Sequence, residues 1–108
     1  MLVLGLAFKE NCPDLRNTRV VDIIESLRGY SAQVDVCDPW VNAQEATREY
    51  GLSLAMPGSG EYDAVVLAVG HDQFRELGGQ GVRSYGRSMS VIYDVKGILP
   101  RNIVDGRL

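Results

Sequence analysis

Short apolar segments without a two-residue period constrain the fold of this chain more than any other feature. Residues 1–8 and 64–69 are almost continuously hydrophobic, which is typical of strands buried on both faces of a parallel sheet. Such strands need helices on each side. Apolar side chains between them recur at helical spacing, at Val20, Ile23, Ile24 and Leu27. The sequence therefore predicts a Rossmann-like α/β fold, a three-layer parallel sheet with helices on both faces.

Turn-forming residues predict where the first elements end. We expect Asn17 or Thr18 to cap the first helix and Gly29 to end it with a positive φ. A second strand over residues 33–37 should stop at Asp38 and Pro39, because proline cannot extend a strand ladder. Asn42 with Glu45 resembles a capping box, and Gly51 should close that second helix.

The second half of the chain continues the alternation of predicted strands and helices. Residues 52–54 are expected to form a small strand, and residues 64–69 the central one. A short helix with Phe74 and Leu77 packed inward should follow residues 70–72, and the glycine-rich residues 78–86 should be irregular. Residues 90–94 form the last predicted strand.

Composition bounds the classes of function. A chain of 108 residues with 45% apolar residues can bury one core, so residues 1–108 are expected to be a single domain. A net charge of -3 argues against a nucleic-acid partner. No apolar run reaches the roughly 18–20 residues of a membrane span and no basic secretory segment begins the chain, so we expect no membrane partner and a cytoplasmic location. Cys12, Cys37 and the single His71 do not make a metal motif, and we expect no metal.

Ligands of open α/β sheets bind beyond the carboxyl ends of the strands. The corresponding segments here are residues 8–16, 38–40, 70–74 and 94–97. The glycine-rich G-x-G-x-x-G turn that holds a dinucleotide pyrophosphate is missing, so this chain alone should bind NAD poorly. Asp38 is either part of an Asp-Pro turn, which we favour, or a ligand contact. His71 is either structural, which we favour, or an acid or base.

Lys9 and Arg16 lie in the long first loop, and composition alone indicates that they are solvated surface charges. The residues Gly5, Phe8, Lys9, Asp14, Arg16 and Thr18, however, follow a spacing similar to the G-x-x-F-K-x-x-x-x-D-x-R-x-S/T signature of the C-terminal domain of UDP-glucose and GDP-mannose dehydrogenases. The resemblance continues through residues 36–39, 63–67 and 91–94, and so covers nearly the whole chain.

This resemblance implies the C-terminal, UDP-sugar-binding domain of a larger enzyme. In that family an N-terminal domain binds NAD and supplies a catalytic cysteine, a central helix makes the dimer, and the sugar C6 alcohol is oxidised to a carboxylate for polysaccharide biosynthesis. The resemblance implies that Phe8 and Lys9 bind the nucleotide sugar and that Arg16 reaches NAD on the N-terminal domain. No catalytic residue is expected in this chain, which should be inactive alone.

The resemblance departs from the UDP-glucose enzymes at two places. Residues 94–97 read Asp-Val-Lys-Gly where those enzymes carry arginine, so Lys96 is expected to take over part of that cationic role. Residues 69–74 also differ, and both segments resemble the branch acting on UDP-N-acetylhexosamines, including the type that serves Vi-like capsular polysaccharides. The alternatives are a freestanding flavodoxin-like nucleotide-binding or protein-interaction module and a complete small oxidoreductase. The first lacks that fold's phosphate loop, and the second lacks the glycine fingerprint and an acid-base constellation.

Overall fold

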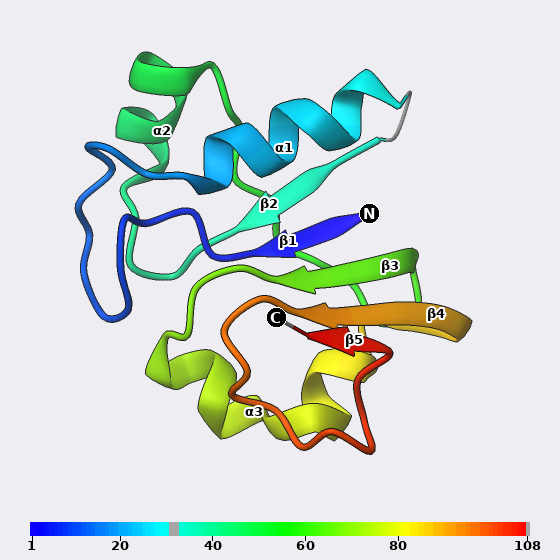
Figure 1. The fold of residues 1–108 in the computed structure, drawn as a ribbon. Helices are drawn as coiled ribbons and strands as arrows, with labels where there is room; N and C mark the ends of the chain where they lie inside the picture. The colour runs from blue at the N-terminus through cyan, green and yellow to red at the C-terminus, as the bar shows by residue number, and fades with distance from the viewer. Residues whose placement is uncertain (31–32, 108) are drawn as a thin grey trace.

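The structure, a computed structural model, describes residues 1–30 and 33–107 and contains one five-stranded sheet with three helices (Figure 1). The elements follow one another as β1 (Leu2–Leu4), α1 (Val20–Gly29), β2 (Asp35–Cys37), α2 (Ala43–Tyr50), β3 (Tyr62–Leu67), α3 (Asp72–Arg83), β4 (Gly86–Asp94) and β5 (Gly106–Arg107).

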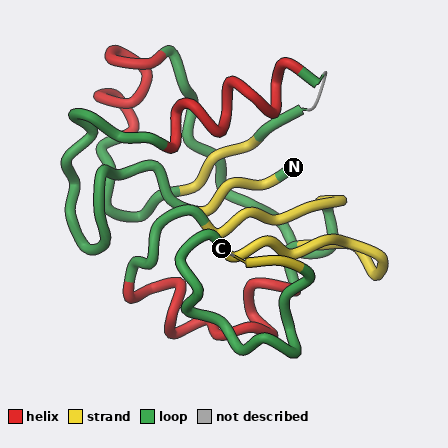
Figure 2. The backbone as a smooth tube through the Cα atoms, in the orientation of Figure 1, coloured by secondary structure: helices red, strands yellow, loops and turns green. Residues whose placement is uncertain are grey.

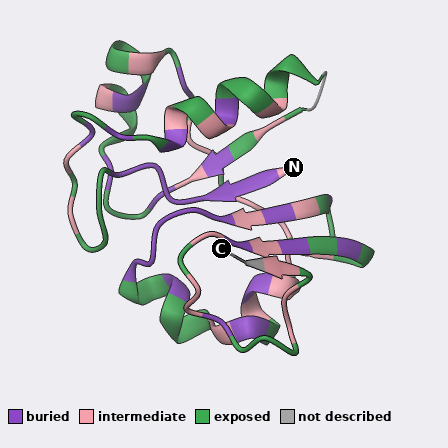
Figure 3. Cartoon of the chain, viewed as in Figure 1, coloured by how far each residue is buried: buried purple, intermediate pink, exposed green. Residues whose placement is uncertain are grey.

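All neighbouring strands are parallel, in the order β2-β1-β3-β4-β5. β1 lies between β2 and β3, with Val3 in register with Val36 on one side and Val66 on the other. Every residue of β1 is fully buried (Figure 3), which explains its unbroken apolar sequence.

Two separate apolar cores cover the two faces of the sheet, and they confirm the predicted three layers. Val3 faces α1 and α2, where Val20, Ile24 and Ala46 pack. Leu2 and Leu4 face the opposite side, where Phe74 and Val82 of α3 pack. Figure 1 shows α1 and α2 on one side of the sheet and α3 on the other.

The cap predicted for α2 is confirmed, whereas for α1 the predicted hydrogen bond to Thr18 is present and the predicted end at Gly29 with a positive φ is wrong. The Asn42 side chain accepts a hydrogen bond from the Glu45 N–H at 3.0 Å, and Gly51 ends α2 at φ 67°. Arg19, without a side-chain hydrogen bond, occupies the N-cap of α1, while Thr18 accepts from the Val20 N–H at 3.2 Å. Gly29 does not have a positive φ, because it is the last residue of α1 and Tyr30 is the C-cap.

Several boundaries in the rest of the chain also differ from expectation. The second strand begins at Asp35, and residues 52–54 contribute only an isolated bridge between Leu54 and Val36. α3 is longer than predicted: Gly78, at φ 68°, kinks it, and its second part runs through the segment expected to be irregular. Leu77 is 40% exposed and does not pack inward. β4 starts at Gly86, before the predicted residue 90, with a register irregularity against β3.

β5 was not predicted, since two residues carry no hydrophobic pattern. It is attached through Asp105, whose carboxylate accepts from the Ile92 N–H at 2.8 Å and from the Arg83 guanidinium at 3.0 Å. Arg83 also donates to the Ile103 carbonyl at 2.6 Å. The end of α3 thereby holds the last segment against β4.

Candidate functional site

The loops that follow the strands gather at the carboxyl edge of the sheet (Figure 2). They are the long loop between β1 and α1, the turn after β2, the start of α3 and the segment after β4. Every candidate binding residue lies on this edge, as expected for an open parallel sheet.

The long loop after β1 is closed at its base by the residues of the signature. Gly5 has φ 102°, and a Cβ on it would lie 2.6 Å from the Val69 Cβ, so both its conformation and its space require glycine. The Thr18 hydroxyl donates to the Leu6 carbonyl at 2.7 Å, and the Phe8 N–H donates to the Asp14 carbonyl at 2.8 Å. These bonds bring the two ends of the loop together and leave its tip projecting.

Arg16 and Asp14 form a two-pronged ion pair on this loop. The guanidinium donates through Nε at 3.1 Å and through Nη2 at 3.2 Å, and it holds the pKa of the Asp14 carboxyl below its usual value. Lys9 adds to this effect through its charge, but it is exposed and makes no hydrogen bond or ion pair with any residue that the structure describes. Arg16 borders a hollow of about 230 Å³ beside Glu45, Glu49 and Tyr50 of α2.

Phe8 and Lys96 come together although 88 positions separate them in the sequence. Both line a hollow of about 150 Å³ that also includes Arg19, Val69 and Val95. The hollow thus combines an aromatic ring with two cations. Arg19 was missed as a site residue, because its place at the start of an amphipathic helix suggests only a solvated side chain. Neither Lys9 nor Arg16 lines this hollow.

Asp94 explains how Lys96 is held at the edge. This fully buried carboxylate accepts from the Lys96 N–H at 3.1 Å, the Gly97 N–H at 2.8 Å and the Leu99 N–H at 2.8 Å. Gly97 has φ 68°. The Asp-Val-Lys-Gly segment is therefore a carboxylate-centred turn that fixes the main chain at Lys96 and leaves the side chain exposed.

Asp38 and His71 form a buried pair beneath the loops. One Asp38 oxygen accepts from the Leu6 and Ala7 N–H groups at 2.7 and 2.9 Å and lies 2.9 Å from His71 Nε2. The other accepts from the Trp40 N–H at 2.8 Å. Burial would raise the pKa of Asp38, but the bonds from His71 and the three amides outweigh burial and lower it. These contacts favour the turn interpretation of Asp38 over a ligand contact.

His71 has both ring nitrogens occupied. Its Nδ1 accepts the Asn11 N–H at 2.8 Å, so the ring proton lies on Nε2 and is donated to Asp38. The side chain is completely buried. This arrangement supports the structural role over an acid or base.

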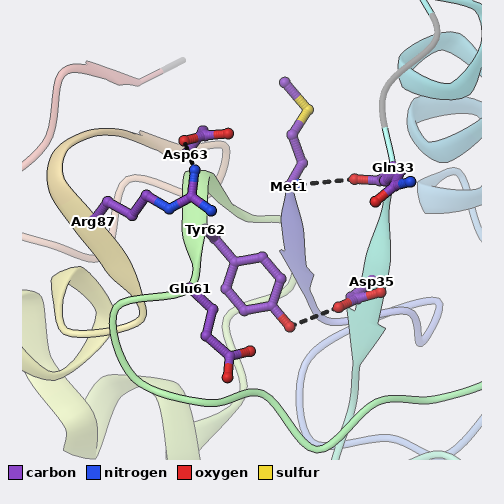
Figure 4. Close-up of a pocket in the computed structure, with 7 residues that line it drawn as sticks. All are labelled: Met1, Gln33, Asp35, Glu61, Tyr62, Asp63 and Arg87. Atoms are coloured by element: carbon purple, nitrogen blue, oxygen red, sulfur yellow. Dashed lines mark hydrogen bonds and ion pairs between the residues drawn. The ribbon is translucent and has the colours of Figure 1, made fainter.

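A larger hollow, about 530 Å³, lies at the opposite, amino edge of the sheet (Figure 4). Tyr62 donates there to Asp35 at 2.7 Å, and Arg87 pairs with Asp63 at 2.7 Å. Both pairs are satisfied internally, and strand amino ends are not where such sheets bind ligands. We therefore place the candidate site at the smaller hollow on the carboxyl edge.

The residues after β1 do not fit a bound dinucleotide. The connection from Gly5 to Arg19 is long and carries the Phe8 side chain, so no short glycine turn presents the start of α1 to a pyrophosphate. For Arg16, the sequence resemblance implies a contact with NAD that another domain holds. Within residues 1–30 and 33–107, no cluster of three or more His, Cys, Asp or Glu could hold a metal ion. No helix in the same residues is long and apolar enough to cross a membrane.

Comparison with curated proteins finds similar sequences along the entire chain. The chain is 48% identical to a UDP-N-acetyl-D-glucosamine 6-dehydrogenase of Salmonella typhi and 49% identical to one of Pseudomonas aeruginosa. Each alignment covers 100% of this chain and 26% of the relative, so the chain spans about a quarter of the length of these proteins. These relatives belong to the branch that the sequence resemblance indicates.

Solved structures share the fold. A UDP-D-ManNAc dehydrogenase from Pyrococcus horikoshii superposes with a TM-score of 0.73 at 23% identity, covering 98% of this chain and 24% of that chain. The model of the UDP binding domain of the UDP-glucose/GDP-mannose dehydrogenase family matches residues 2–101. Nearly complete coverage by one domain model argues against an unrelated flavodoxin-like module, and the chain belongs to the UDP-glucose/GDP-mannose dehydrogenase family as its UDP binding domain.

Proposed function

We propose that this chain binds the nucleotide sugar in an NAD-dependent UDP-sugar 6-dehydrogenase whose substrate is a UDP-N-acetylhexosamine. The observation that carries this proposal is the hollow in which Phe8, Lys96 and Arg19 meet at the carboxyl edge. A pyrophosphate needs cations, and lysine and arginine supply charge and several donors. The exposed ring of Phe8 offers an apolar face for a base or sugar.

Calorimetric titration of the chain with UDP-N-acetylglucosamine tests the hollow. Lys96→Met should weaken binding about tenfold, the lower end expected for an exposed charge-assisted hydrogen bond. Phe8→Ala should also weaken it. Arg28→Met, which removes an exposed cation at the far end of α1, is the matched control and should leave the affinity unchanged. Equal affinity of the Lys96→Met and control variants would contradict the assignment.

Lys9 and Arg16 are proposed to have separate partners, because Arg16 borders the hollow beside α2 and Lys9 lines neither that hollow nor the one with Phe8 and Lys96. Lys9, whose ammonium has no ion-pair partner among the described residues, is assigned to the sugar nucleotide, and Arg16 to NAD held mainly by the N-terminal domain. In the full-length enzyme, Lys9→Ala should cost roughly 2–4 kcal/mol in kcat/KM. Arg16→Ala should instead raise the KM for NAD and leave UDP-sugar binding to this chain nearly unchanged. The reverse pattern would refute both roles.

The oxidation itself is assigned to the rest of the enzyme, which we expect to be a homo-oligomer. Residues 1–30 and 33–107 offer no site that fits the dinucleotide, and we propose no catalytic residue in the chain. The purified chain should therefore produce no NADH from any UDP-sugar and NAD. Measurable NADH production would refute this division of labour.

A further inference from the structure

The tip of the loop that carries Lys9 and Arg16 is tied to the start of α3 by one residue. The Asn11 N–H donates to His71 Nδ1 at 2.8 Å, and the Asn11 side-chain oxygen accepts from the Asp72 N–H at 2.9 Å. Asn11 has φ 54°, a conformation that asparagine tolerates better than most residues. Asn11 thus makes two hydrogen bonds to the adjacent residues His71 and Asp72, and we call these three residues the clamp.

The clamp is anchored in the core through His71. Its Nε2 is bound to Asp38 at 2.9 Å, and its ring lies 6.1 Å from that of Trp40 and 5.6 Å from that of Phe74. Asp38 is in turn bound by the amides that follow β1. The exposed loop tip is thus connected to the segment after β2 and to the start of α3 through the buried, hydrogen-bonded pair of His71 and Asp38.

Other contacts of the loop act mainly at its base. The Phe8 and Thr18 bonds close its two ends, and Tyr50 donates to the Leu15 carbonyl. Among the hydrogen bonds and ion pairs of the described residues, the other contact near the tip is the ion pair of Glu10 with Arg75 at 3.7 Å, which is about half exposed and so worth little. The position of the tip depends chiefly on the clamp.

We propose that Asn11 and His71 are positioning residues that hold this loop in its binding conformation, so that Lys9 meets the UDP-sugar without an ordering cost. The inference rests on the proposed function of the loop. Neither residue needs to touch the ligand. A loop ordered before binding avoids the entropy loss that a mobile loop incurs, which improves affinity without any new contact.

Three substitutions separate the hydrogen bonds that hold Asn11 from the bond that anchors His71 to Asp38. Asn11→Gly keeps the N–H and permits the positive φ, and removes the side chain whose oxygen accepts from the Asp72 N–H. His71→Gln keeps a donor at the place of Nε2 for Asp38 and loses the acceptor for Asn11. His71→Asn is the matched control. Its side-chain oxygen replaces Nδ1 as the acceptor for the Asn11 N–H, while the bond to Asp38 is lost.

Hydrogen exchange and calorimetry on the 108-residue chain, at a temperature where circular dichroism shows every variant folded, test the proposal. Asn11→Gly and His71→Gln should speed exchange of the loop amides and the Asp72 amide about tenfold, leave the Val65 and Ile92 amides unchanged, and weaken UDP-N-acetylglucosamine binding about tenfold. His71→Asn should bind within about twofold of the parent chain despite lower stability.

The outcomes distinguish this proposal from the proposed function. If the parent chain does not bind UDP-N-acetylglucosamine, the function is wrong, and the clamp is still judged by the exchange rates. Unchanged loop exchange in Asn11→Gly and His71→Gln overturns the clamp. Faster exchange with unchanged affinity overturns its positioning role. Equal loss of affinity in all three variants would also overturn the positioning role, because binding would then follow the stability of the chain and not the hydrogen bonds of Asn11.

Discussion

At the scale of single residues, Gly5 shows how a signature glycine follows from packing. Its φ of 102° and the 2.6 Å that would separate a Cβ from Val69 leave no room for a side chain. Gly5 also donates to the Cys37 carbonyl at 2.8 Å, directly after β1. Glycine here lets the chain leave the central strand and enter the binding loop.

Gly5→Ala is therefore expected to destabilise the chain by about 3 kcal/mol, from overpacking and left-handed strain together. Gly29→Ala is the control, because a Cβ at that position meets nothing within 4 Å and the residue lies within α1. It should be neutral or stabilise by up to about 1 kcal/mol. Urea unfolding of both variants measures the difference, and equal midpoints would contradict the strain argument.

Asp38 is the residue whose loss should affect most contacts at once. Asp38→Asn places an amide NH₂ among N–H donors, and removing one partner of a buried charged network costs about 3–5 kcal/mol. The pKa of Asp38 is lowered in the folded chain, so its contribution to stability is complete above the ordinary value of 3.8 and is lost as the pH falls below it. Acid titration of the parent chain and of Asp38→Asn should show a shallower loss of stability in the variant below about pH 4. Parallel curves would disprove the linkage.

At the scale of elements, helix ends depend on different kinds of interaction. The cap of α2 involves residues that are close in sequence. Asn42 takes the serine position of a capping box and Glu45 follows three residues later, so the sequence predicts this cap correctly. The start of α1 depends instead on the Thr18 hydroxyl, which is shared between Val20 and the Leu6 carbonyl of another segment. The kink of α3 at Gly78 likewise serves packing, since Gly79 lies directly against Ile103.

Asn42→Ala should lower the free energy of unfolding by about 1 kcal/mol, because the Glu45 N–H loses its acceptor. Asn42→Ser, which keeps a capping oxygen, should restore most of the loss. Thermal unfolding monitored by circular dichroism provides the measurement. Equal melting temperatures for the alanine and serine variants would show that the cap does not limit stability.

At the scale of the whole molecule, the two edges of the sheet have different roles. The carboxyl edge carries the hollow in which Phe8 meets Lys96 and Arg19, whereas the amino edge carries internally satisfied pairs such as Tyr62 with Asp35. That pair joins β3 to β2 across the amino end of β1. Burial, followed by the Asp35 hydrogen bond, raises the pKa of Tyr62 to about 12.

This raised pKa predicts a loss of stability in alkali. Because the folded pKa exceeds the ordinary value of 10.0, the contribution is complete below pH 10 and disappears as the pH rises towards about 12. Tyr62→Phe should remove this part of the alkaline dependence while leaving the acid limb unchanged. Denaturant midpoints measured from pH 8 to 11.5 would reveal it, and an unchanged alkaline slope in the variant would exclude Tyr62 as the cause.

The sequence by itself determined the three-layer parallel fold, the α2 cap, and the loop that bears Phe8, Lys9 and Arg16, because hydrophobic periodicity and capping are local properties. Only the tertiary structure decided which residues meet. Lys96 and Arg19 reach Phe8 through the Asp94 turn and the start of α1, and His71 fixes the loop tip through Asn11. β5 depends on Arg83 and Asp105, a contact 22 residues apart that no strand pattern announces. Such contacts depend on loop paths in three dimensions, and a periodicity along the chain carries no information about them.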